Sequence, residues 1–97
     1  MIFAEMEHPG EYWDFHEELK SFLCSHFSHV ESGMQTDSWF WIFDGGEKVA
    51  LDTFSSMKHQ VKSARDGSHV EHVISVLRLK YPVRVYPKPV LEGHEDN

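Results

Sequence analysis

Histidine and cysteine are the residues of this sequence whose types and spacing come closest to a chemical motif. The chain of 97 residues contains eight histidines and a single cysteine. Cys24, His26 and His29 lie close together, and His69 and His72 are one helical turn apart. Imidazole and thiolate groups brought together from these two places would bind a transition metal such as zinc. The spacing matches no HExxH or paired CxxC pattern, so we expect neither a metal site nor another cofactor.

Acid–base catalysis would require a carboxylate or histidine held in a cleft with a shifted pKa. The sequence begins with a run of carboxylates that usually forms one solvated face, and neither a nucleophile elbow nor a phosphate-binding glycine pattern accompanies it. We therefore expect no enzymatic activity. A histidine-dependent metal-binding or small enzymatic domain is the alternative hypothesis. The carboxylates are Glu5, Glu7, Glu11, Asp14, Glu17 and Glu18.

The stretch Ser38–Gly46, SWFWIFDGG, brings five consecutive large apolar side chains into a turn. Aspartate and glycine accept the positive φ of tight hairpin turns, which predicts a hairpin with strands over 39–43 and 48–53. Because side chains alternate along a strand, large apolar groups must lie on both faces of the sheet.

The length of the turn decides which face each side chain takes. With a two-residue turn, Phe40 and Ile42 share a face with the apolar residues of the second strand, and the other three aromatic side chains point away. With a three-residue turn, the two groups exchange faces. Those other three side chains are Trp39, Trp41 and Phe43.

Partial exposure of two or three such rings would approach the area of the largest apolar patch on an ordinary monomer, about 300 to 600 Å². We therefore predict a partner-binding surface on the sheet. Its partner is either a second copy of this chain or another protein. Another part of the chain covering the second face is the competing interpretation. The candidate binding residues are Trp13, Trp39, Phe40, Trp41, Ile42 and Phe43.

Two amphipathic helices are expected to support the sheet. Between Pro9 and Phe27 apolar residues recur every three or four positions, and Pro9 suits a first helical turn. A second helix is expected from Ser68, where the sequence SHVE has the form of a capping box between Ser68 and Glu71, and it must end before Pro82.

The remaining segments complete a predicted α+β fold. Strands are expected over 1–7, 28–35 and 83–86, and residues 58–64 form either a strand or a short helix, with the strand preferred. This order predicts a two-layer sandwich, a mainly antiparallel sheet with two helices on one face, either ferredoxin-like or a variant with an extra strand. We expect one domain over 1–92 and a frayed tail over 93–97.

Charge and composition narrow the choice of partner. The net charge is −7, and the first 47 residues hold ten acids and one lysine. Such a surface disfavours nucleic acid and suits a basic protein partner, as in an inhibitor or immunity-type protein. A single cysteine, no signal-peptide pattern and no apolar run of about 20 residues predict a cytoplasmic protein without membrane contact. We expect a small acidic binding or regulatory protein that acts through protein contacts.

Overall fold

Six strands and two helices follow one another in the computed structural model, which describes residues 1–92. The predicted frayed tail 93–97 lies outside the described residues. The elements in chain order are β1 (Ile2–Met6), α1 (Tyr12–His26), β2 (Val30–Met34), β3 (Ser38–Asp44), β4 (Glu47–Asp52), β5 (His59–Lys62), α2 (Ser68–Leu77) and β6 (Val83–Val90).

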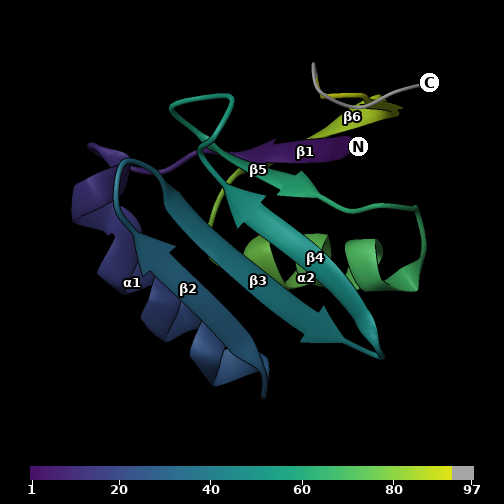
Figure 1. Ribbon diagram of the computed structural model, residues 1–97, viewed down its shortest axis with the longest axis horizontal. Helices are drawn as coiled ribbons and strands as arrows, with labels where there is room; N and C mark the ends of the chain where they lie inside the picture. The colour runs from purple at the N-terminus through teal and green to yellow at the C-terminus, as the bar shows by residue number, and fades with distance from the viewer. Residues whose placement is uncertain (93–97) are drawn as a thin grey trace.

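The strands form one sheet in the order β2-β3-β4-β5-β1-β6, and every neighbouring pair is antiparallel (Figure 1). The predicted α+β class with an antiparallel sheet and two helices is therefore confirmed. Four strands separate the two helices, whereas a ferredoxin-like βαββαβ unit has two strands at that point. The ferredoxin-like arrangement is not confirmed.

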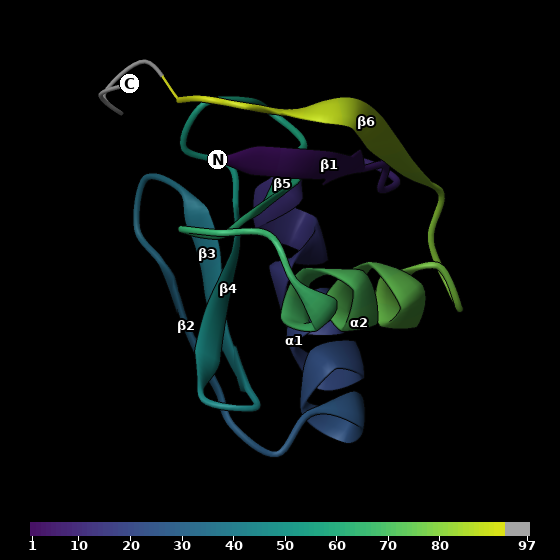
Figure 2. The same ribbon diagram turned by 90° about the vertical axis from the view of Figure 1, so that its right-hand side faces the viewer.

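Both helices lie on the concave side of a strongly curved sheet (Figure 2). α1 packs against β2 and β3, and α2 packs against β1, β4 and β5. Apolar side chains from both layers form one core between them. The predicted helical stripe is present, since Phe15, Leu19 and Leu23 of α1 are all buried. The hydrophobic core thus lies between the helices and this side of the sheet.

The hairpin between β3 and β4 has the two-residue turn, because Asp44 pairs with Glu47. Gly45 and Gly46 both have positive φ, 59° and 83°, which suits the twist of a tight hairpin. This register places Phe40 and Ile42 on the helix side, where both side chains are fully buried. The other three aromatic residues of β3 point to the face without helices.

The helix starts differ from the expectations. α1 begins at Tyr12, after Gly10 has turned the chain at a φ of 69°, and so Pro9 precedes the helix. The prediction of a capping box at Ser68 is wrong. The N-cap residue of α2 is Gly67, and no side chain forms a hydrogen bond at this cap. The backbone carbonyl of Gly67 accepts from the amide of Glu71 at 3.3 Å instead.

The predicted strands over 58–64 and 83–86 correspond to β5 and β6. Residues 59–62 form β5, which confirms the strand interpretation of that segment. β6 extends to Val90, four residues beyond the expected end, because an edge strand tolerates the missing amide donors of Pro87 and Pro89.

Candidate functional site

A row of three aromatic side chains from β3 lies on the helix-free face of the sheet, and we call it the aromatic row: Trp39, Trp41 and Phe43. Each of the three is half-buried, although α1 and α2 both lie on the opposite face of the sheet. Across the hairpin they face Asp52, Ala50 and Lys48 in turn. The aromatic row is therefore held in place by strand pairing while part of each ring remains accessible.

Neighbouring side chains cover the aromatic row only in part. The Lys48 ammonium lies 4.4 Å from the ring centre of Trp41, a cation–π contact. The His29 imidazole stacks on Phe43 with ring centres 4.4 Å apart. Trp39 lies across the backbone of Gly33 on β2, where an added Cβ would be only 2.5 Å from the indole Nε1. Gly33 thus allows Trp39 to lie flat on the edge strand.

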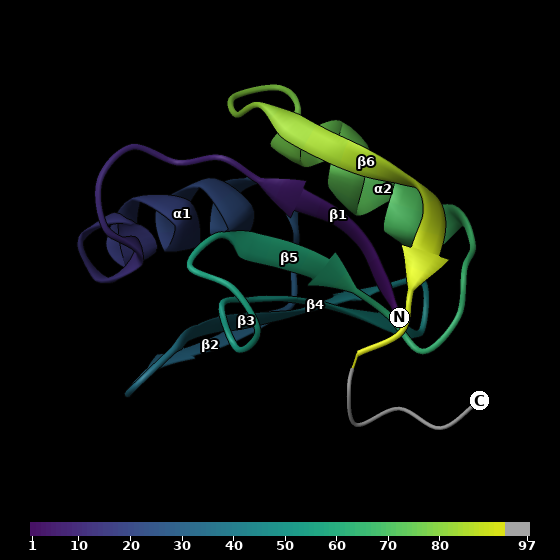
Figure 3. The same cartoon turned by 90° about the horizontal axis from the view of Figure 1, so that it is seen from above.

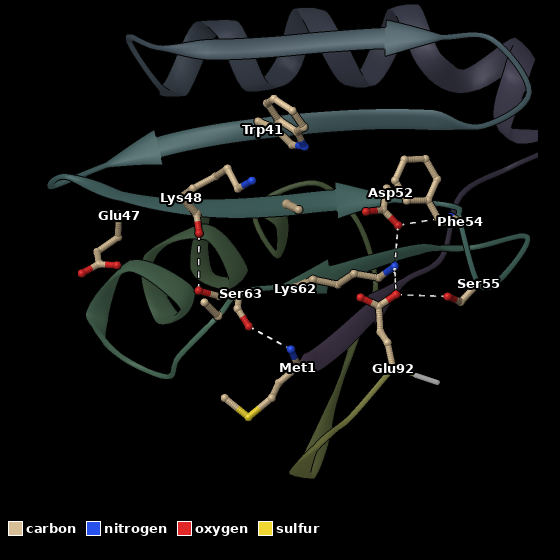
Figure 4. Close-up of a pocket in the computed structure, with 12 residues that line it drawn as sticks. Met1, Trp41, Glu47, Lys48, Asp52, Phe54, Ser55, Lys62, Ser63 and Glu92 are labelled. Atoms are coloured by element: carbon tan, nitrogen blue, oxygen red, sulfur yellow. Dashed lines mark hydrogen bonds and ion pairs between the residues drawn. The ribbon is translucent and has the colours of Figure 1, made fainter. Parts of the chain in front are cut away.

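An open groove of about 760 Å³ adjoins the aromatic row, with Trp41 and Phe54 among its lining residues (Figure 4). Lys62 lies in this groove between two carboxylates, with Nζ 2.7 Å from Asp52 Oδ1 and 2.6 Å from Glu92 Oε2. Burial lowers the pKa of Lys62, but the hydrogen bonds and charges of these two carboxylates outweigh that effect and raise the pKa above its usual value. The groove therefore contains a compensated ion cluster rather than a free cation.

The far end of the same face is also ionic. Glu5 of β1 accepts a hydrogen bond from the Tyr86 hydroxyl at 3.2 Å. Lys58 and Arg84 approach the same carboxylate, at 3.9 and 3.5 Å. The helix-free face is therefore divided, with aromatic groups near β2 and β3 and charged groups from β5 to β6. Such a charged half is compatible with solvent and needs no covering layer.

The structure separates the predicted binding residues into three places. Phe40 and Ile42 belong to the core beneath the helices, so they are out of reach of a partner. Trp13 lies on α1, where it is 52% exposed and packs edge-on against Tyr12. Of the six predicted binding residues, the three of the aromatic row lie on the helix-free face of the sheet.

The histidines and the cysteine singled out for metal chemistry do not converge. His29 Nε2 lies 3.1 Å from a Glu31 carboxylate oxygen, and His72 Nδ1 lies 2.8 Å from Asp44 Oδ2. His69 instead bonds Ser63 Oγ at 3.0 Å. Within residues 1–92, no group of three His, Cys, Asp or Glu side chains is arranged to hold a metal ion.

A buried polar cluster that the sequence patterns did not predict joins α1, β3 and β5. Ser38 Oγ lies 2.7 Å from His16 Nδ1 and 2.8 Å from His59 Nε2. A hydroxyl can both donate and accept, so Ser38 forms hydrogen bonds with both imidazoles. The Ser38 amide also donates to Thr53 Oγ1 at 3.1 Å. No local spacing in the sequence indicates this cluster, because its members come from three distant elements.

Burial keeps this cluster neutral. Desolvation, together with smaller effects of the neighbouring His8 and His16, lowers the pKa of His59 to about 3. Desolvation likewise lowers the pKa of His16. Ser38 and His59 have no solvent-exposed surface, so a substrate cannot reach them without opening the fold. The cluster is a structural network that fixes α1 on the sheet.

Comparison with family models, with curated proteins and with solved structures gave no match for this chain. In the described part of the chain, neither helix has the length and apolar character needed to cross a bilayer.

Proposed function

We propose that this chain is a non-catalytic protein-binding module whose binding surface includes the aromatic row. One observation carries the proposal: three large aromatic side chains lie next to one another on the sheet face opposite α1 and α2. Trp39 and Trp41 are in mutual contact, with ring centres 4.8 Å apart. Tryptophan and tyrosine rings in such positions dominate the energetics of many protein interfaces, because they bury a large area at a small entropic cost.

The charge of the chain supports a protein partner or a second copy rather than nucleic acid. The single-stranded nucleic-acid platforms that use stacked aromatic rings combine them with a positive groove. Here the ammonium group of Lys62 is neutralised by Asp52 and Glu92, and within residues 1–92 the cation that lies over the aromatic row is Lys48. The free and exposed thiol of Cys24 supports our further proposal of a cytoplasmic, reducing location.

Site-specific photo-cross-linking tests the binding function and reports the partner through the mass of the adduct. A benzophenone amino acid is introduced in living cells at position 41, and in a matched control at Leu79, which is 70% exposed and lies just beyond α2. We expect an adduct of defined mass from position 41 and none from position 79. The same adducts from both positions, or none from either, would contradict the proposal.

A polar substitution separates binding from folding. Trp41→Ser removes the ring from a half-buried site, so we expect the loss of association to exceed the loss of folding stability. Association is measured by sedimentation and stability by urea unfolding. A large loss of stability with unchanged association would instead assign Trp41 a purely structural role.

A further inference from the structure

The strand β2 forms one edge of the sheet, and its outward backbone groups are unpaired within residues 1–92. The carbonyl of His29 accepts from the amide of Phe43 at 3.1 Å, so the odd-numbered residues of this segment direct their hydrogen bonds toward β3. The even-numbered residues Val30, Ser32 and Met34 consequently direct their amides and carbonyls outward. α1 lies in a separate layer from β2, which leaves this edge open in the plane of the sheet (Figures 1 and 3).

The two edges of the sheet differ in how they are protected. At the β6 edge, Pro87 and Pro89 lack amide donors, and the charged residue Lys88 stands between them. β2 has the sequence VESGM, without proline, lysine or a bulge in its pairing with β3. Natural proteins usually protect an exposed edge with such features, because an open edge is a template for another strand.

We propose that β2 pairs in antiparallel fashion with β2 of a second copy of this chain, about a twofold axis at Ser32. The inference rests on the proposed function, since it names a second copy of this chain as the protein partner, joined at the edge strand beside the aromatic row. In this register Val30 lies opposite Met34 of the second copy, and Glu31 lies opposite Gly33. About six hydrogen bonds would join the two chains through the outward groups of residues 30, 32 and 34.

Hydrogen-bond geometry and charge select this register from its alternatives. Only the even-numbered residues of β2 direct their backbone groups outward, so an even-numbered residue must lie opposite an even-numbered residue of the second copy. Moving the axis by one residue toward the start of β2 sets Glu31 opposite Glu31 of the second copy, and like charges directly opposed are destabilising. Moving the twofold axis by one residue toward the end of β2 leaves fewer residues of β2 paired with the second copy. The axis at Ser32 uses all five residues and opposes each glutamate with a glycine.

The sequence of β2 is therefore complementary to itself, which points to a second copy rather than an unrelated strand. Its apolar residues Val30 and Met34 meet on the helix side. On the other side, Trp39 lies over Gly33, and its Nε1–H makes no hydrogen bond within residues 1–92. Glu31 of the second copy is directly opposite Gly33, so its carboxylate is positioned to accept from that indole.

The test measures the mass of the full chain in solution by sedimentation velocity over a concentration series. We expect a species of twice 11.3 kDa. Ser32→Pro removes an outward amide that makes no bond to β3, so it should weaken dimerisation about thirtyfold while leaving the fold intact. Ser32→Ala keeps the amide and should dimerise as the original chain does. Circular dichroism verifies that both variants are folded.

The register is tested by a disulfide in a Cys24→Ser background. Ser32→Cys should form an intermolecular disulfide, because the two Cα atoms at the twofold axis lie about 5.5 Å apart. Glu31→Cys should form it far more slowly, since the two residues 31 are diagonal rather than opposite. A dimer with the reverse preference would overturn the register.

A folded monomer at every concentration would overturn the dimer itself. If position 41 still cross-links to a different protein in that case, the binding function stands and only the identity of the partner is wrong. Loss of the position 41 adduct together with a monomer would refute both proposals.

Discussion

Mild acid should weaken the fold through His59, whose imidazole is fully buried. The native state holds this side chain neutral with a pKa of about 3, because burial disfavours the charged form and His8 and His16 add to the effect. In the unfolded chain the pKa of a histidine is about 6.5. Between these two values the unfolded state takes up a proton that the native state refuses, so stability falls as the pH falls through this window.

The size of the effect follows from the two pKa values. Above about pH 7.5 both states are neutral and the contribution of His59 to stability is complete. At pH 5 the unfolded histidine is almost fully protonated and the native one is not, which costs about 2 kcal/mol. His16 shifts in the same direction and adds to the loss. The total is a substantial part of the stability of a small domain.

Urea unfolding followed by tryptophan fluorescence at about pH 8 and pH 5 measures this loss. His59→Gln removes the titrating group, so its stability should change between the two pH values by about 2 kcal/mol less than that of the original chain. His26→Gln, at an exposed site on α1, serves as the matched control for replacing a histidine outside the buried cluster. An equal pH dependence in the original chain and in His59→Gln would refute the reasoning.

Four substitutions test the packing described above, each by urea unfolding. Lys62→Met leaves two carboxylates without their buried cation. It should cost about 3 to 5 kcal/mol of stability, the usual effect of breaking a buried ion pair. A loss below about 1 kcal/mol would mean that the groove is well solvated. Gly33→Ala places a Cβ against the Trp39 ring, so it should cost about 1 to 3 kcal/mol of stability and change the tryptophan emission. An unchanged emission spectrum would show that the ring does not lie on β2. Phe40→Ala should cost about 3 to 5 kcal/mol, whereas Phe43→Ala on the opposite face should cost clearly less; equal losses would contradict the observed register.

Local patterns were sufficient to predict the elements but not their order in the sheet. The spacing of Phe15, Leu19 and Leu23 predicted α1, and the DGG turn predicted the hairpin, because both signals are local in the chain. The position of β1 between β5 and β6 depends on long-range packing, and no short sequence pattern encodes it. The capping box failed for a related reason: Gly67 took the cap position that the local pattern assigned to Ser68.

The polar cluster was missed because its members appear ordinary when each is considered alone. His16 is within the helical stripe, Ser38 begins a strand, and His59 follows a loop. Only the fold brings Ser38 Oγ to 2.7 Å from His16 Nδ1 and 2.8 Å from His59 Nε2. The candidate site was partly predictable, since the two-residue turn was one of two registers that the sequence left open, and that choice alone decides which rings lie in the aromatic row.

β3 links the core, the polar cluster and the proposed interface through its alternation. Its even-numbered residues supply Ser38 to the cluster and Phe40 and Ile42 to the core, and they hydrogen-bond to β4. Its odd-numbered residues form the aromatic row and hydrogen-bond to β2. A slip of one residue would therefore bury Trp39 and Trp41, expose the core residues and break the cluster at the same time. Because the core fixes the register of β3 so strongly, it also fixes which backbone groups of β2 face outward. The proposed dimer edge is in this sense a consequence of the core.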